Sequence, residues 1–379
     1  MVALLSLFVG TDSSWSGDEG AALHQARILV EHDRWGLPST LPAVDPEGDW
    51  FPIRHSWPVE SGMAPLAKRP LYPVLVSVGW LVSPKWGPVA VSVLGAVVAA
   101  AASGLIARRI RPALDRPTLW VAGLGSPLLF DSQIVIAHTL GAAAVTLAVL
   151  NALRFFDHHR RLDLAGVFAF VTLAGLVRSE AVLAALALAL AAPIATRFTR
   201  AGRQVGVVAL AAAGAAWMLE RFTLGLIGVR VAPLVPGGSG AGWVADRWTG
   251  FWATWFQPGY RDDPLELMLV GAVVLMAVAV VLARKRAGVE LVTALVGAAA
   301  GLILARLLLG GGATVPGIVW AFPLAPLGVM AQKRAHLDDL TVRFVLITAA
   351  LFAGAVLATQ YPTGGTWEWG WRYFAIAVG

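Results

Sequence analysis

The sequence predicts an all-α protein whose helices cross a membrane many times. Three observations indicate this class: 58% of the 379 residues are hydrophobic, only 14% are charged, and the mean hydropathy is +0.71. A soluble domain carries about 25% charged residues. The missing charge leaves long apolar runs, and about 20 helical residues are enough to cross a bilayer. Runs without Asp, Glu, Lys or Arg include 86–107, 132–153 (with one histidine, His138), 267–283, 307–332 and 344–367.

The charge and the cysteine content exclude several classes of function. The formal charge is +6 and the pI is about 10.1, but basic residues in a membrane protein mostly set its topology, so we expect no nucleic-acid partner. The chain has no cysteine, which excludes disulfides and cysteine-bound zinc. Its first ten residues are apolar but lack the basic start and the small-residue cleavage site of a signal peptide.

Five short clusters of basic residues indicate the topology. The clusters are Arg108 to Arg116, Arg154 to Arg161, Arg197 to Arg203, Arg284 to Arg286 and Lys333 to Arg343. The positive-inside rule places all five in the cytoplasm. Neighbouring clusters are separated by enough apolar sequence for two helices, and an even number of crossings returns the chain to the same side.

The helices follow from the apolar runs between these clusters. We predict helices at 86–107, 117–132, 134–154, 163–178, 180–197, 204–225, 265–283, 289–309, 314–331 and 341–359. With an apolar piece at each end (1–10 and 373–379), the chain has about 11–12 spans in a single membrane domain over 1–379. Ten helical residues cover only about 15 Å, so we expect that both ends are cut and that the C-terminus is truncated.

Three segments lie on the outer side in this topology: 11–85, 229–264 and 360–372. Of the 16 tryptophans, 11 lie in 11–67, 229–264 and 360–372. An aromatic belt at the membrane surface accounts for part of this enrichment, but a belt appears on both faces. The asymmetry favours a ligand site on the outer face, because indole rings stack on sugars and pack against lipid tails.

The first outer segment opens with a pair of acidic residues. A helical pattern over 20–30 places apolar residues on one face and predicts an amphipathic helix lying on the membrane. Ser16 and Glu19 fit a capping box. Asp18 lies in the first turn, where the helix dipole favours a negative charge. Glu19 is therefore either a cap or a functional acid, and Asp18 is either a dipole-stabilising residue or a base or metal ligand.

A second helix in this segment, Leu71 to Val82, is too short to span. If it crossed the membrane, every later basic cluster would move to the outside, so we predict an interfacial or re-entrant helix. Lys68 and Arg69 then lie on the same side as Asp18 and Glu19. The alternative role for these two cations is to bind lipid headgroups.

These residues resemble the first outer loop of the C-type (GT-C) membrane glycosyltransferase superfamily, which includes protein O-mannosyltransferases and lipid A aminoarabinose transferases. The resemblance rests on Gly17-Asp18-Glu19-Gly20 and on Lys68-Arg69-Pro70-Leu71-Tyr72-Pro73. Arg178-Ser179-Glu180 is similar to an Arg-Pro-Glu of the family. The segment from Gly364 to Tyr373 is similar to its Gly-Gly…Trp-Gly-Pro-Arg-Tyr. Ser179 and Trp371 stand where the family has proline.

The resemblance implies an inverting glycosyltransferase on the outer face of the cell membrane. Its donor would be a polyprenyl-phosphate sugar and its acceptor a hydroxyl of a glycan, lipid or protein. Asp18 would act as the base, assisted by Glu19. The donor phosphate would bind the basic residues Lys68, Arg69, Arg178 and Arg372. The substrate pocket would include Tyr72, His138, Glu180, Trp371 and Tyr373.

The resemblance also leaves room for a divalent cation (Mg, Mn or Ca) held by Asp18 and Glu19, with His24 or His138 as a further ligand. From the residues alone, His138 is a hydrogen-bonded structural histidine in an apolar helix. Arg178 and Arg372 also fit helix-end residues that extend to the headgroups. Glu220 and Arg221 fall near the outer end of a helix, where they can pair with each other.

Two other functions fit parts of the pattern. A transporter or flippase of a lipid-linked or amphipathic solute would show internal repeats and broken helices in matching halves. The break at Gly310-Gly311-Gly312 has no partner in the first half of the sequence. A membrane scaffold without catalysis would tolerate substitution of Asp18.

Overall fold

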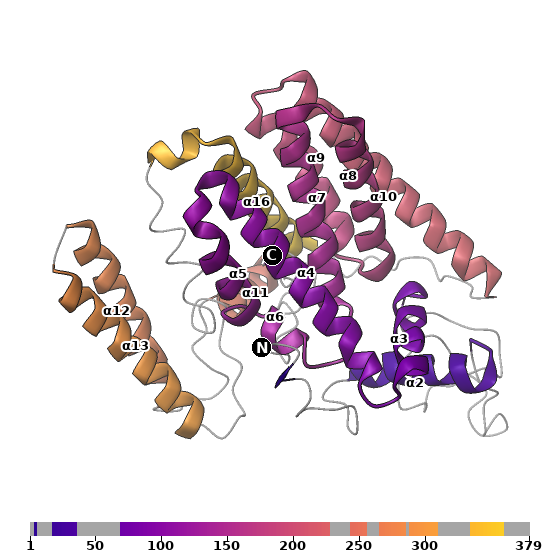
Figure 1. The fold of residues 1–379 in the computed structure, drawn as a ribbon, viewed down its shortest axis with the longest axis horizontal. Coiled ribbons are helices and arrows are strands. Elements are labelled where there is room, and N and C mark those ends of the chain that lie inside the picture. Colours follow the sequence, from indigo (N-terminus) through magenta and orange to yellow (C-terminus); the bar gives the residue numbers. More distant parts are fainter. Residues whose placement is uncertain are drawn as a thin grey trace. The chain divides into compact units, whose positions relative to one another are not determined.

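The computed structural model describes residues 4–5, 17–35, 69–227, 243–255, 265–285, 288–309 and 334–359. All the regular structure in these ranges is helical (Figure 1), which confirms the all-α class. The helices form two compact units. The first takes Met1–Gly238, Leu340–Val356 and Phe374–Gly379, and the second takes Ser239–Asp339 and Leu357–Tyr373. The single domain over 1–379 stays a prediction.

Within the described ranges, six helices are long and apolar enough to cross a membrane. They are α4 (Gly87–Ile110), α7 (His138–His158), α10 (Arg200–Leu226), α12 (Glu266–Arg284), α13 (Val289–Leu309) and α16 (Leu340–Thr359). Each coincides with a predicted span. Shorter helices cover two more predicted spans: α8 (Arg161–Val177) and α9 (Ala181–Ala195). The predicted helix at 314–331 and most of the two end pieces lie outside the described residues.

Alanine-rich helix faces form the core of the first unit. Helix α4 packs on α7, α7 packs on α8, and α10 packs on both α8 and α9. The core includes Ala148, Ala152, Ala192 and Ala209, each of them fully buried. Small side chains let helix backbones approach closely, and membrane helices use them in the same way.

The basic clusters of the first unit gather at one end of the bundle. Arg109, near the end of α4, forms an ion pair with Asp157, near the end of α7. Arg343, near the start of α16, donates from Nε to the carbonyl of Ala195 at 2.8 Å, at the end of α9. This common end agrees with the even number of crossings between clusters. That this end faces the cytoplasm stays a prediction.

The helix predicted at 117–132 is wrong as a single element. The structure has α5 (Asp115–Leu124) and the four-residue α6 (Leu128–Asp131) in its place. Gly125-Ser126-Pro127 separates them, because proline has no N–H to donate and disfavours helix at the residue before it. Ser126 Oγ replaces part of the lost hydrogen bonding: it donates to Ala122 and accepts from the N–H of Leu128. An irregular, mostly buried segment, 132–137, then leads into α7.

Both helices predicted in the first outer segment are present. They are α2 (Gly17–His32) and α3 (Leu71–Val82), and Figure 1 shows α2 running across the direction of α4. Ala22 and Ala26 of α2 are buried in a cluster with Tyr72 and Val76 of α3. The apolar face of α2 is therefore covered in part by α3. Whether the two helices lie in the membrane interface stays a prediction.

A close backbone contact fixes the corner between α3 and α4. A Cβ atom built on Gly87 would lie 1.8 Å from the carbonyl oxygen of Gly79, and one built on Gly79 would lie 2.4 Å from the carbonyl oxygen of Gly87. Neither position has room for any side chain. The corner therefore fixes the direction of α3 relative to α4, and with it the position of Tyr72.

The second unit contains a helix that was not predicted. The outer segment 229–264 includes α11 (Trp243–Trp255), in which Trp248 stacks on Phe251 with ring centroids 5.8 Å apart. Phe251 also lies 6.5 Å from the Trp255 ring, so these three aromatic rings adjoin along α11. Helices α12 and α13 pack on each other as a hairpin.

We predict that Gly87→Ala destabilises the protein by roughly 1–3 kcal/mol or more, because the new methyl group meets backbone that cannot move aside. Gly214→Ala in α10 is the matched control, since its Cβ would meet nothing within 4 Å. Its stability should change by less than about 1 kcal/mol. Thermal unfolding in lipid nanodiscs measures both, and equal midpoints would contradict the close contact.

The absence of cysteine allows a direct test of topology. A single cysteine at Glu31 in α2 should react with a membrane-impermeant maleimide added outside intact cells. A cysteine at Arg160, between α7 and α8, should react only after permeabilisation, because the positive-inside rule places it in the cytoplasm. Both positions are exposed. Labelling of Arg160→Cys from outside would contradict the predicted orientation.

Candidate functional site

A buried polar cluster lies at the end of the first unit where α2 and α3 meet segment 132–137. The ends of α8 and α10 and the start of α9 complete it. Six residues singled out in the sequence contribute to this cluster: Glu19, Arg69, Tyr72, His138, Arg178 and Glu180. They come from distant parts of the chain, so the fold brings together what the motifs only suggested.

Glu19 is fixed by the irregular segment. Its side chain is almost fully buried, with 1% of the residue exposed, and its Oε1 accepts a hydrogen bond from the Val135 N–H at 2.9 Å. Ser16, the other half of the proposed capping box, lies outside the described residues. Asp18 is half-buried. Because neighbouring side chains leave a helix in different directions, the pair divides into one clamped and one more accessible carboxylate.

Tyr72 and Ser92 hold the next residue of the same segment. Ser92 Oγ donates to the Ile136 carbonyl at 3.2 Å and accepts from the Ile136 N–H at 3.3 Å. The Tyr72 hydroxyl lies 3.4 Å from Ser92 Oγ. Burial raises the pKa of Tyr72 far above its usual value, although the bond to Ser92 opposes this, and the charge of Glu19 raises it further. The phenol therefore stays protonated at neutral pH.

A histidine–carboxylate pair closes the two ends of segment 132–137. His138 Nδ1 lies 3.2 Å from Asp131 Oδ2, and both residues are buried. The sequence predicts a hydrogen-bonded histidine here, and this bond is present. His24 lies on the exposed side of α2.

Two arginines enter the cluster already paired with carboxylates. Arg69 Nη1 is 2.9 Å from Glu220 Oε2 on α10 and also donates to the Gly175 carbonyl. Arg178 Nη2 is 2.5 Å from Glu180 Oε1. Burial lowers the pKa of Arg69, and the charges of Glu220 and Glu180 raise it again.

The local pair of Glu220 and Arg221 that the sequence suggested is replaced by the distant pair of Glu220 and Arg69. Arg221 instead lies over the Trp217 ring at 5.6 Å.

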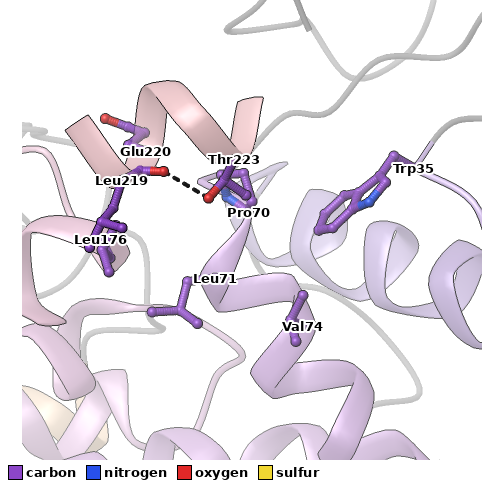
Figure 2. Close-up of a pocket in the computed structure, with 8 residues that line it drawn as sticks. All are labelled: Trp35, Pro70, Leu71, Val74, Leu176, Leu219, Glu220 and Thr223. Atoms are coloured by element: carbon purple, nitrogen blue, oxygen red, sulfur yellow. Dashed lines mark hydrogen bonds between the residues drawn. The ribbon is translucent and has the colours of Figure 1, made fainter. Parts of the chain in front are cut away.

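An apolar cavity of about 220 Å³ adjoins the Arg69–Glu220 pair (Figure 2). Its lining residues are Trp35, Pro70, Leu71, Val74, Leu176, Leu219, Glu220 and Thr223. Figure 2 shows the Glu220 carboxyl group turned away from Trp35. The Thr223 hydroxyl donates to the Leu219 carbonyl at 2.8 Å. The surface offered to a ligand is therefore mainly hydrocarbon and indole.

The remaining predicted site residues cannot be placed. Lys68, Arg372, Trp371 and Tyr373 all lie outside the described residues. Within the described ranges, no three His, Asp or Glu side chains come together in a way that could hold a metal ion.

Three residues of the cluster had little or no signal in the sequence. Asp131 is an acid inside an otherwise apolar run, and this was the one available sign of a buried polar role. Ser92 lies in an uninterrupted apolar helix. Glu220 was noted near a helix end, but its partner Arg69 lies far away in the sequence.

Comparisons with protein-family models, with curated proteins and with solved structures found no match. Function is therefore inferred from the residues of the cluster and the cavity.

We predict that Glu19→Ala lowers the free energy of unfolding by roughly 1–3 kcal/mol, because it leaves the buried Val135 N–H without its acceptor. Glu19→Gln keeps an oxygen at the same place and should lose clearly less. Chemical or thermal unfolding of both variants in nanodiscs checks this. An equal loss in the two would mean that the charge of Glu19 matters for stability rather than its hydrogen bond.

Proposed function

We propose that the chain is an inverting glycosyltransferase embedded in the membrane. It would move a sugar from a polyprenyl-phosphate donor to an acceptor hydroxyl of a glycan, lipid or protein on the outer face. The observation that carries this proposal is the buried cluster of carboxylates and arginines beside an apolar cavity. This region offers phosphate-binding groups and a surface for a lipid chain, and Asp18, next to Glu19 in the first turn of α2, offers a base.

The acidic pair supports the base assignment. The carboxylate of Glu19 is already engaged by Val135, whereas Asp18 is less deeply buried. Asp18 is therefore the better candidate to take the proton of the acceptor hydroxyl, with Glu19 holding the start of α2 in place. General-base assistance of this kind contributes about 100- to 10,000-fold to a rate.

The transfer itself conserves atoms and electrons. The acceptor oxygen gives its proton to Asp18 and forms a bond to the anomeric carbon from the face opposite the phosphate. The bond between that carbon and the phosphate oxygen breaks, and its electron pair stays on the phosphate. The products are the glycosylated acceptor, with inverted configuration, and polyprenyl phosphate.

Negative charge grows on the leaving phosphate during this step, so cations placed beforehand stabilise the transition state. Arg69 and Arg178 fit this role because a guanidinium can donate two parallel hydrogen bonds to phosphate oxygens. The cavity next to Arg69 would take the first part of the isoprenoid chain. Lys68 and Arg372 stay candidates for the same phosphate.

A transporter or flippase of a lipid-linked solute is the second candidate. The break between α5 and α6 favours it, because irregular buried backbone near spans often lines a transport site. The irregular segment 132–137 that follows this break is also explained by its contacts with Glu19 and Ser92, which fix it to α2 and α4.

We predict that Asp18→Asn lowers the turnover number about 100-fold or more with donor binding retained. The assay is transfer from radiolabelled mannosyl, arabinosyl and glucosyl polyprenyl phosphates by protein in nanodiscs. Asp33→Asn is the matched control, because it makes the same chemical change at an exposed residue just after α2.

Two results would count against the proposal. Full activity in Asp18→Asn would remove Asp18 from the role of base. No transfer and no donor hydrolysis by the wild-type protein, with all three donors, would favour transport.

A further inference from the structure

The four charges around Arg69 balance one another. Arg69 pairs with Glu220, and Arg178 pairs with Glu180. Little of any of these side chains is exposed: 18% of Arg69, 7% of Glu220, 11% of Arg178 and 1% of Glu180. Two cations and two carboxylates thus sum to zero in surroundings where solvent screens them weakly. The sequence analysis assigned Arg69 and Arg178 to the donor phosphate and did not pair Arg69 with Glu220.

The cluster still has polar atoms to offer. Glu220 Oε1 and Arg178 Nε are buried, and neither has a hydrogen-bond partner among the described residues. A buried polar atom without a partner costs free energy. Because one of these atoms is a donor on an arginine, the cluster has capacity for a further acceptor group.

Balanced charge limits which anion can enter. An added anion must take over hydrogen bonds that Glu220 or Glu180 now makes, and it leaves its own charge as an excess. A buried charge is tolerated only when it is compensated. The cost therefore rises with each additional negative charge on the ligand.

We propose that Glu220 is a specificity-determining residue: its carboxylate, set against Arg69, makes the site select a singly charged phosphodiester lipid over a diphosphate lipid. This inference rests on the proposed function in one respect, namely that an isoprenoid phosphate binds beside the cavity. It adds the residue that selects the charge class of that ligand.

The test compares two short isoprenoid ligands. Farnesyl methyl phosphate is a phosphodiester with a single charge, and farnesyl diphosphate carries the same chain with a higher charge. Their dissociation constants are measured by calorimetry for the wild-type protein and for Glu220→Gln in nanodiscs of neutral lipid. Glutamine keeps the shape of the side chain and an oxygen that can accept from Arg69.

The wild type should bind the phosphodiester more tightly. Glu220→Gln makes the cluster one charge more positive, so it should bind both ligands more tightly and the diphosphate most. We expect the preference for the phosphodiester to fall about tenfold, which corresponds to about 1.4 kcal/mol. Glu290→Gln, at an exposed position in the first turn of α13, removes the same charge elsewhere and should leave the ratio unchanged.

The outcomes separate this inference from the proposed function. Binding of both ligands with the same ratio in wild type and Glu220→Gln overturns the role of Glu220 and leaves the donor class intact. Failure of the wild type to bind either ligand overturns both. If Glu220→Gln unfolds at a lower temperature than the wild type, Glu180→Gln provides the second test, and an unchanged ratio there overturns charge selection.

Discussion

A single hydrogen bond, from the Val135 N–H to the Glu19 carboxylate, joins the break in the bundle to the helix that carries the acidic pair. Backbone that leaves a helix inside an apolar protein must find other partners for its N–H and C=O groups. Here Glu19 and Ser92 supply them for two successive residues, and Tyr72 contacts Ser92 in turn. The helix break and the arrangement of α2 and α3 therefore depend on each other. Without these side chains the N–H and C=O groups of the irregular segment would lose their partners, and without the segment Glu19 would lose the hydrogen bond from Val135.

The buried arginines also need partners, and in their case the partners are opposite charges. A guanidinium buried among apolar helices needs a carboxylate close by, and Glu220 and Glu180 meet that need. The consequence for the proposed function is that the charges of these two pairs sum to zero before any substrate arrives. In the proposed function, recognition of the donor phosphate would then depend on exchange of partners rather than on simple attraction, and the apolar cavity beside Arg69 would supply a second source of affinity through burial of hydrocarbon.

Much of the fold could be predicted from the sequence, because long apolar runs and basic clusters are governed by the bilayer and not by tertiary detail. Helices α4, α7, α12, α13 and α16 follow directly from that pattern. The irregular segment 132–137 could not, since the apolar run 132–153 continues through it and the contacts that stabilise it come from Glu19 and Ser92, far away in the sequence. At the site, Arg69 and Glu19 were found from their motifs. Their partners Glu220 and Val135 were not, because a pairing across a hundred residues leaves no local pattern.

The corner between α3 and α4 has a consequence for divergence. Backbone touches backbone at Gly79 and Gly87, so no change in a neighbouring side chain can make room for a larger residue at either place. Lipid-facing positions in the same helices are free to exchange one apolar residue for another. A distant relative with this corner would keep the two glycines after most of its other residues had changed, and their spacing would identify the shared ancestry better than the overall identity.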